Sequence, residues 1–392
     1  MANPADDYTH NNRVTLVRGG KPYFDHLVQL ISSAEETLHL QTYSFADDQT
    51  GQLVVDALVK ARDRGVRVFL MVDGYASQGL SKHFIRDVRR KGIQFKFFEP
   101  LFRSRRFYLG RRLHHKVCVA DMRFALVGGI NIADHYNDMN KPAWLDFALN
   151  VEGEVVQQLL VLCQKTWNGF QPMAKIPSPR SVPFFMIPPD VRSEVRMRRN
   201  DWVRRKNQIA SSYIEMFDKA ESEIVILCSY FLPGSVFRKA MRHAVERGVK
   251  ITVILAGISD VKMAKLAERY MYEWLLNKGI TIYEYNETIL HGKLAICDQQ
   301  WITLGSFNVN DISTYASVEL NLDVADPRFA REVYTYLQQN IKNKSTQVSD
   351  RYLAENSTVI QRFLRWSSFL ISRILVFFFT FYFKQVKETE SP

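Results

Sequence analysis

Histidine, lysine and asparagine recur at identical spacing in two stretches of this 392-residue chain. In both stretches a His is followed two positions later by a Lys and seven positions later by an Asp. After six further residues comes a four-residue segment: Gly, then either Gly or Ser, then a variable residue, then Asn. An imidazole can attack phosphorus or carry a proton, while ammonium and carboxamide groups stabilise the negative oxygens of a phosphate. Two copies predict one shared site for phosphoryl chemistry. The stretches are LHHKVCVADMRFALVGGIN (113–131), with His114, Lys116, Asp121, Gly129 and Asn131, and LHGKLAICDQQWITLGSFN (290–308), with His291, Lys293, Asp298, Ser306 and Asn308.

Each stretch has the residue pattern of a β-hairpin. Around His114 and Lys116 polar and apolar residues alternate, which is typical of a strand and places the two side chains on one face. The Asp then falls at a turn, and a second apolar strand follows, Phe124–Val127 or Trp301–Leu304. This return strand is expected to bring Gly and Asn back beside the His and Lys.

Helices and strands alternate through the part of the chain that precedes the first hairpin. Apolar spacing predicts helices ending near Ala34, Arg64 and Arg90, and short apolar runs after them predict buried strands. This alternation is typical of an α/β sandwich. The expected elements are helix 23–34, strand 38–45, a turn at 47–51, helix 53–64, strand 66–72, a helix to 90 and strand 93–98.

The order of elements repeats in the second half of the sequence. Arg247-Gly248-Val249 corresponds to Arg64-Gly65-Val66, and Lys278-Gly279-Ile280 corresponds to Lys91-Gly92-Ile93. This internal duplication predicts two pseudo-symmetric halves whose hairpins meet in one active site. The expected organisation is a first half over 1–170, a Pro-rich connector over 171–190, a second half over 191–350 and an apolar, basic tail over 351–392.

The two motifs resemble the paired HKD motifs of the phospholipase D superfamily, and further segments are similar to short bacterial cardiolipin synthases. The resemblance implies a duplicated phospholipase D-like α-β-α sandwich. It covers roughly residues 20–337 and implies the shorter, peripheral form of that family, without the amino-terminal membrane helices of the long form. The further matching segments are Tyr230-Phe231-Leu232-Pro233, Gly257-Ile258-Ser259-Asp260, Glu284-Tyr285 and Glu319-Leu320-Asn321-Leu322.

The resemblance also implies roles for the motif residues. One His forms a phosphohistidine and the other moves protons; His114 is the expected nucleophile and His291 the acid/base, although the symmetry of the sequence permits the reverse. An acidic residue downstream of each hairpin, Asp146 or Glu319, orients an imidazole. No metal or cofactor is required. Lys116, Lys293, Asn131 and Asn308, with Gly129 and Ser306, would surround the phosphate, and Asp121 and Asp298 belong to the catalytic motif, although their turn positions also suit a structural role.

The implied activity is a phosphatidyltransferase that makes cardiolipin and glycerol from phosphatidylglycerol. A hydrolase releasing phosphatidic acid and a nucleic-acid phosphodiesterase remain alternatives, because the motifs do not distinguish alcohol from water. Phosphatidylethanolamine or glycerol could replace the second lipid. The net charge of +11 favours a polyanionic partner, which an anionic membrane or a nucleic acid would satisfy equally.

The carboxyl-terminal tail favours the membrane over nucleic acid. Residues 363–383 are strongly apolar, and a helix from Trp366 to Phe383 would be about 27 Å long, near the roughly 30 Å of a bilayer core. Arg373 at its centre would cost about 2.5–3.5 kcal/mol in a span. We therefore expect an interfacial helix, with Trp366 and Arg373 in the head groups of the bacterial inner membrane and the catalytic part in the cytoplasm.

A basic and aromatic run precedes the first motif. Such runs are usually solvated, but this one leads directly into the strand that carries the first His, where guanidinium groups could bind phosphate head groups. Both interpretations remain open. The head-group candidates are Arg105, Arg106, Arg111 and Arg112.

Overall fold

The computed structural model describes residues 7–100, 111–139, 141–170, 186–355 and 357–388. Most of the expected connector, including Phe184 and Phe185, lies outside these ranges.

The first half is a mixed sheet with helices, in the order β1-β8-β7-β6-β2-β3-β4 across the sheet. Strands β2, β3 and β4 are parallel, and the other pairs are antiparallel. Its elements are β1 (Thr9–Arg18), α1 (Lys21–Ser33), β2 (Thr37–Thr42), α2 (Gln49–Asp63), β3 (Arg67–Asp73), α3 (Lys82–Arg90), β4 (Gln94–Phe98), β5 (Arg112–Leu113), β6 (Lys116–Ala120), β7 (Phe124–Gly128), β8 (Phe147–Gly153) and α4 (Val155–Trp167).

The second half repeats this arrangement, in the order β9-β16-β15-β14-β11-β12-β13 with β17 added at the edge. The duplication expected from the sequence is therefore confirmed. Its elements are β9 (Ser193–Asp201), β10 (Lys206–Asn207), α5 (Gln208–Lys219), β11 (Glu223–Cys228), α6 (Ser235–Glu246), β12 (Lys250–Ala256), α7 (Lys262–Tyr270), α8 (Tyr272–Asn277), β13 (Thr281–Tyr285), β14 (Lys293–Cys297), β15 (Trp301–Gly305), α9 (Asp311–Tyr315), β16 (Ser317–Ala325), α10 (Pro327–Tyr336) and β17 (Ser345–Val348).

Two of the predicted boundaries were wrong. The strand expected over 38–45 ends at Thr42. The segment expected to be a turn at 47–51 contains the start of α2, which begins at Gln49. The Asp48 side chain accepts a hydrogen bond from the Gly51 N–H at 2.9 Å, so it caps the helix. Turn-forming residues and helix-capping residues are the same chemical types, which explains the misreading.

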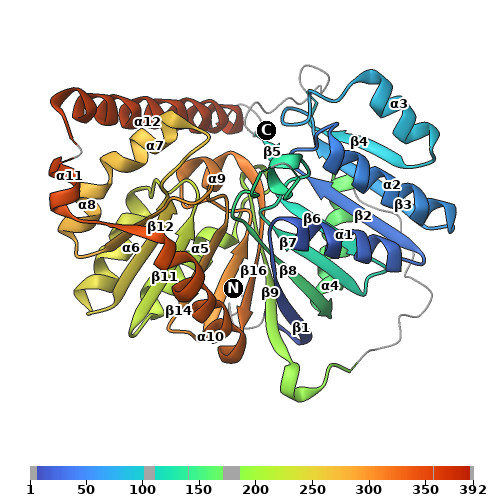
Figure 1. The fold of residues 1–392 in the computed structure, drawn as a ribbon, viewed down its shortest axis with the longest axis horizontal. Helices are drawn as coiled ribbons and strands as arrows, with labels where there is room; N and C mark the ends of the chain where they lie inside the picture. Colours follow the sequence, from blue (N-terminus) through green and yellow to red (C-terminus); the bar gives the residue numbers. More distant parts are fainter. Residues whose placement is uncertain (1–6, 101–110, 140, 171–185, 356, 389–392) are drawn as a thin grey trace.

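Successive side chains of the central strands pack into two different hydrophobic cores, one on each face of the sheet. Val117 and Val119 of β6 join a cluster that links both sheets with α4 and α10. Cys118 and Ala120 point to the opposite face, where α1, α2 and α3 cover the first sheet. Helices α5, α6 and α8 cover the corresponding face of the second sheet (Figure 1). Apolar packing on both faces fixes the register of the motif hairpins.

The two halves exchange backbone hydrogen bonds where they meet. The N–H groups of His114 and His115 both donate to the Val318 carbonyl, at 2.9 and 3.0 Å. Symmetrically, the N–H groups of His291 and Gly292 donate to the Leu145 carbonyl, at 2.7 and 2.9 Å. The start of each motif is therefore hydrogen-bonded to the backbone of the opposite half. Strand β5, paired with β16, and the bridge between Leu145 and Leu290 extend this contact.

The tail forms α11 (Asp350–Glu355) and a 30-residue helix, α12 (Val359–Glu388), that lies along α7 and reaches α9 (Figure 1). Arg365 and Ser368 are buried against the protein, whereas Phe363 is 61% exposed. Among the described residues, no helix meets the length and hydropathy needed to cross a bilayer. Other apolar side chains that α12 exposes are Val359, Ile360, Leu364, Trp366, Leu370, Ile371, Ile374 and Leu375.

Candidate active site

His114 is held by a carboxylate from the other half of the molecule. Its Nδ1 lies 2.9 Å from Glu319 Oε2, on β16. Because the acceptor is a carboxylate, the proton belongs on Nδ1 and the Nε2 lone pair is available for chemistry. Burial lowers the pKa of His114, while Glu319 opposes this shift, so the imidazole is neutral at neutral pH.

His291 has the mirror arrangement. Its Nδ1 lies 2.6 Å from Asp146 Oδ2, next to β8 of the first half. Burial, reinforced by the charge of Lys293, lowers the pKa of His291 to about 3. Its side chain is 7% exposed, against 17% for His114. The two imidazoles are therefore chemically alike but unequally accessible.

The crossing of these pairs follows from the backbone. Val318 and Leu145, which bind the histidine N–H groups of the opposite half, immediately precede Glu319 and Asp146. The same strand contact thus places each carboxylate beside the imidazole of the other half. The sequence predicted both acids as orienting residues, and the structure adds which imidazole each one holds.

Both motif lysines lie in this site. Lys116 Nζ donates to the His114 carbonyl at 2.5 Å, and Lys293 Nζ donates to the His291 carbonyl. Burial, followed by repulsion from Lys293, lowers the pKa of Lys116 to about 7. Each lysine also lies close enough to act electrostatically on the histidine of the other half. The four side chains therefore form one site. An anion bound here would relieve the repulsion between the ammonium groups.

The two asparagines occupy equivalent positions with different partners. Asn308 Oδ1 accepts a hydrogen bond from Ser229 Oγ at 2.7 Å, which turns its amide N–H groups away from that contact. Asn131 Oδ1 accepts from the Ser44 N–H at 3.1 Å, and its Nδ2 donates to the Tyr136 hydroxyl at 2.9 Å. Both carboxamides are thereby held in a fixed orientation, as a preorganised donor requires.

Gly129 and Ser306 account for a local difference between the halves. The Ser306 hydroxyl donates to Glu319, and the first half has no equivalent hydroxyl because Gly129 occupies this position. A Cβ added at Gly129 would lie 2.5 Å from Asp146 Oδ1. The carboxylate of Asp146, which is one methylene shorter than Glu319, therefore has room only if residue 129 is glycine.

We expect Gly129→Ala to lower the turnover rate about 10²-fold, because displacing Asp146 misplaces the His291 imidazole. Ser306→Ala removes one hydrogen bond without a clash and should cost about tenfold. Steady-state rates of the two variants on the same substrate check this order. Equal losses would contradict the steric explanation.

Asp121 and Asp298 lie at the hairpin turns, at the opposite ends of β6 and β14 from the histidines. Asp121 accepts hydrogen bonds from the N–H groups of Glu35, Glu36 and Thr37, at 2.7 to 2.8 Å. Asp298 binds the equivalent backbone at 221–223. Their turns have positive φ at both central positions, 50° and 57° at Asp121 and Met122, typical of tight hairpins. These carboxylates support the fold and do not contact the imidazoles.

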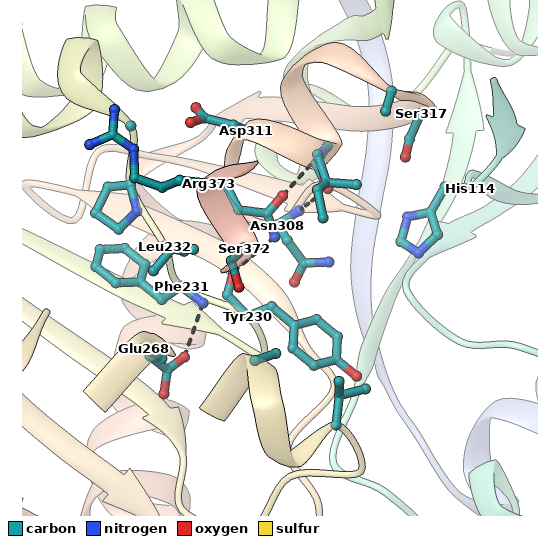
Figure 2. A pocket seen from close by; sticks show the side chains of 18 of the residues that line it. His114, Tyr230, Phe231, Leu232, Glu268, Asn308, Asp311, Ser317, Ser372 and Arg373 are labelled. Atoms are coloured by element: carbon teal, nitrogen blue, oxygen red, sulfur yellow. Dashed lines mark hydrogen bonds between the residues drawn. The ribbon is translucent and has the colours of Figure 1, made fainter. Parts of the chain in front are cut away.

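A cavity of about 600 Å³ opens beside His114. It extends over the second half, where Asn308, Leu232 and Phe231 line it, and α12 forms one wall (Figure 2). Its size suits a head-group-sized ligand, since pockets for small molecules span roughly 300–1,000 Å³. Arg112 and Arg373, both predicted head-group contacts, line this cavity.

The other head-group candidates have different positions. Arg111 is buried and pairs with Asp201, at 2.8 Å, and with Glu99, at 3.2 Å. It joins the two halves instead of facing a lipid, which corrects that expectation. Arg105 and Arg106 lie outside the described residues, and Trp366 is exposed on α12.

Aromatic contacts to the histidines were not predicted from the sequence. Tyr43 packs edge-on against His114 with ring centroids 4.8 Å apart, and Tyr136 packs against His291 at 5.2 Å. Asp73, fully buried, accepts a hydrogen bond from the Leu113 N–H at 2.8 Å and so fixes the residue before His114. Tyr43 and Asp73 lie at the carboxyl ends of parallel strands, a position that could have indicated them.

The cysteines and possible metal ligands complete the description. All four cysteines are buried and unpaired. Within the described ranges, no group of three or more His, Cys, Asp or Glu side chains is placed to hold a metal ion.

Comparison with known proteins gives the family. Residues 27–167 and 213–341 match the family model described as cardiolipin synthase, PLD-like domain. The chain is 31% identical over 354 residues to cardiolipin synthase B of Salmonella typhimurium, covering 89% of this chain and 85% of that protein. It is 28% identical over 363 residues to cardiolipin synthase B of Escherichia coli (strain K12), with the same coverage.

Solved structures confirm the fold class. A phosphatidylserine synthase of Haemophilus influenzae Rd KW20 superposes with a TM-score of 0.71 at 13% identity, covering 93% of this chain and 94% of that one. A polyphosphate kinase from Porphyromonas gingivalis gives a TM-score of 0.58 at 17% identity, covering 91% of this chain and 53% of that one. At these identities the likeness concerns the fold alone. With both motif hairpins inside the matched ranges, the chain belongs to the cardiolipin synthase family of the phospholipase D superfamily and is an enzyme of that family.

Proposed function

We propose that the protein joins two phosphatidylglycerol molecules into cardiolipin and releases glycerol. The observation that carries this proposal is the pair of imidazoles, each with its Nδ1 held by a carboxylate of the other half and both beside a lysine. Relatives named cardiolipin synthase B, which match along most of their length, support the choice of substrate.

In the first step one imidazole Nε2 attacks phosphorus of the donor lipid. A P–N bond forms, the bond between phosphorus and the glycerol oxygen breaks, and the second imidazole supplies a proton to the departing glycerol. The general acid must be protonated at that moment. A bound phosphate raises the pKa of the buried histidine, because its negative charge stabilises the imidazolium.

In the second step a hydroxyl of the acceptor lipid attacks the phosphohistidine. The second imidazole, now neutral, removes the hydroxyl proton, the P–O bond to the acceptor forms, and the P–N bond breaks. The enzyme returns to its starting state. Lys116, Lys293 and the amide groups of Asn131 and Asn308 would stabilise the non-bridging oxygens in both steps.

Accessibility supports His114 as the nucleophile. It lines the cavity, and it is the more exposed of the two imidazoles. The nucleophile must reach phosphorus directly, whereas an acid/base can act on an oxygen at the inner side of the site. His291, the more buried residue, then acts as the acid/base.

The test is a mass-spectrometric lipid assay of the purified protein with phosphatidylglycerol vesicles. Cardiolipin and glycerol in equal amounts are expected. Phosphatidic acid as the sole lipid product would replace the transferase with a hydrolase that uses water as acceptor. Absence of any product would direct attention to other head groups and then to nucleic acid.

We further propose that α12 attaches the enzyme to the cytoplasmic face of the bacterial inner membrane. The helix turns Arg365 and Ser368 toward the protein and exposes Phe363 and Trp366. An exposed apolar face of this size is unfavourable in water and suits the region between head groups and acyl chains. The protein would thus consist of two catalytic halves, 1–170 and 191–350, joined through 171–190. The membrane-attachment segment, 351–392, would follow the second half.

Replacing Ile360, Phe363 and Ile374 together by Ser should weaken binding to anionic vesicles about a hundredfold. Each side chain contributes about 1 kcal/mol when partly buried in the interface. Vesicle co-sedimentation measures the change. Leu53→Ser, a partly exposed apolar residue on α2, is the matched control, and an unchanged sedimentation of the triple variant would exclude this role for α12.

A further inference from the structure

The cavity beside His114 continues to a second, cationic end. In Figure 2, His114 lies at one side of the cavity, and Arg373 and Asp311 lie at the opposite side. Apolar side chains also line the cavity. They include Leu232, Pro233, Val261, Ile312 and Phe369.

Two arginines from different helices line the cavity, and both act electrostatically on Asp311 at this far end. Arg238 projects from the first turns of α6, and Arg373 projects from α12. Arg373 lies over the Phe369 ring and Arg238 over the Trp274 ring, each 5.9 Å from the ring centroid. Within the described part of the chain, neither guanidinium forms an ion pair.

Asp311 is the acidic group near this pair. Burial raises the pKa of its carboxyl, and the charges of Arg373 and Arg238 oppose that shift, so both guanidinium groups act on it. Its Oδ1 lies against Gly234, the residue before α6, whose amino-terminal end has no side-chain cap. The helix dipole therefore also stabilises Asp311. Two positive side chains and one carboxylate line this end of the cavity, so its net charge is positive.

We propose that Arg238 and Arg373 bind the phosphodiester group of the acceptor phospholipid. This inference rests on the proposed function, because a reaction that joins two phospholipids must hold two phosphodiesters in one cavity. Lys116 and Lys293 take the donor phosphate beside the imidazoles. The second phosphodiester needs its own cationic partners at a distance from the first, and guanidinium groups suit it because they bind phosphate through two parallel hydrogen bonds.

The position of Arg373 fits an acceptor that remains in the membrane. The exposed side chains of α12 include Phe363 and Trp366, and Arg373 of the same helix lines the cavity. With α12 in the interface, as proposed above, Arg373 lies at the level of the head groups. The cavity of about 600 Å³ suits head groups, and the apolar walls suit the upper parts of acyl chains. The site therefore selects acceptors that carry a phosphate over water and free glycerol, which carry none.

The experiment compares two acceptors for the same phosphatidyl group. Phosphatidylglycerol vesicles are supplied with isotope-labelled glycerol, so that transfer to the lipid gives cardiolipin and transfer to glycerol gives labelled phosphatidylglycerol. We expect Arg238→Gln and Arg373→Gln each to lower cardiolipin formation tenfold to a hundredfold, as for a lost charge-assisted hydrogen bond. Labelled glycerol incorporation should stay within about twofold, because donor cleavage does not use this pair.

Matched variants separate this effect from general loss of charge. Arg242→Gln on α6 and Arg362→Gln on α12 remove exposed arginines that do not line the cavity, and both activities should persist. Vesicle co-sedimentation is measured for all four variants. Equal loss of both products in the cavity variants, no loss of either, or a loss that follows reduced sedimentation would overturn the acceptor site. Labelled glycerol exchange without any cardiolipin from the wild-type protein would overturn the proposed function, and the acceptor site with it.

Discussion

Replacement of either active-site histidine should abolish phosphatidyl transfer while leaving the fold intact. We expect His114→Ala and His291→Ala each to lower the turnover rate about 10³-fold or more, because both steps use both imidazoles. Each side chain is fixed mainly by one carboxylate and one aromatic ring, so thermal unfolding should change little beyond the loss of those contacts. Cardiolipin formation on vesicles and a thermal melt give the two readouts.

A substrate with an activated leaving group distinguishes the roles of the two histidines. A phosphatidyl ester of p-nitrophenol needs no general acid, because p-nitrophenolate leaves without protonation. His291→Ala should therefore release one equivalent of p-nitrophenolate in a burst and then stop, since no base activates the acceptor. Intact-protein mass spectrometry should find the phosphatidyl group attached to the enzyme, and peptide mapping should locate it on His114.

The same assay can contradict the proposal in two ways. A burst from His114→Ala, with the label on His291, would exchange the two roles and keep the covalent mechanism. Steady release without a burst in both variants, with no labelled peptide, would exclude a phosphohistidine intermediate. His115→Ala is the control for a neighbouring buried histidine, because its Nε2 bonds Gln41 at 2.9 Å within the interior of the first half.

Loss of charge at the crossed carboxylates should have the next largest effect. We expect Glu319→Gln and Asp146→Asn to lower the turnover rate about 10²–10⁴-fold. The amides keep the size of the side chain, but they remove the charge that stabilises the imidazolium and can hold the wrong tautomer. Glu152→Gln is a suitable control, because this buried acid on β8 pairs with Arg13 instead of an imidazole.

Nuclear magnetic resonance of ¹⁵N-labelled histidine rings tests the crossing itself. Glu319→Gln should move the ring signals of His114, and Asp146→Asn should move those of His291, with assignments taken from the alanine variants. The opposite pattern would mean that each carboxylate serves the histidine of its own half. Unchanged signals in both would mean that neither carboxylate orients an imidazole.

The helix α12 illustrates a partial success of sequence reasoning. The apolar residues around Trp366 predicted a helix, and Arg373 at its centre argued against a membrane span. The structure contains that helix, but its buried face carries Arg365, while most of the described side chains that it exposes are apolar. Periodicity gives the spacing of the two faces, whereas only packing against α7 decides which one turns outward.

The basic run before the first motif shows where reasoning from single residues fails. Arg111 and Arg112 are adjacent and chemically identical, yet one pairs with Asp201 at the interface of the halves and the other lines the cavity. Arg111 precedes β5, whereas Arg112 is its first residue, and the Asp201 that pairs with Arg111 comes from a distant part of the chain. Composition alone therefore could not separate them.

By itself the sequence determined the chemistry and the duplication. Two copies of His, Lys and Asn at one spacing, in hairpins of alternating residues, are local patterns, and local patterns fix strand faces and turns without reference to the rest of the chain. Tertiary structure decided how the copies combine. Which carboxylate holds which imidazole, which histidine lines the cavity and where α12 adds Arg373 all depend on contacts between residues far apart in sequence. Such contacts form only when the two sheets pack against each other, because neither half alone contains a histidine together with its carboxylate.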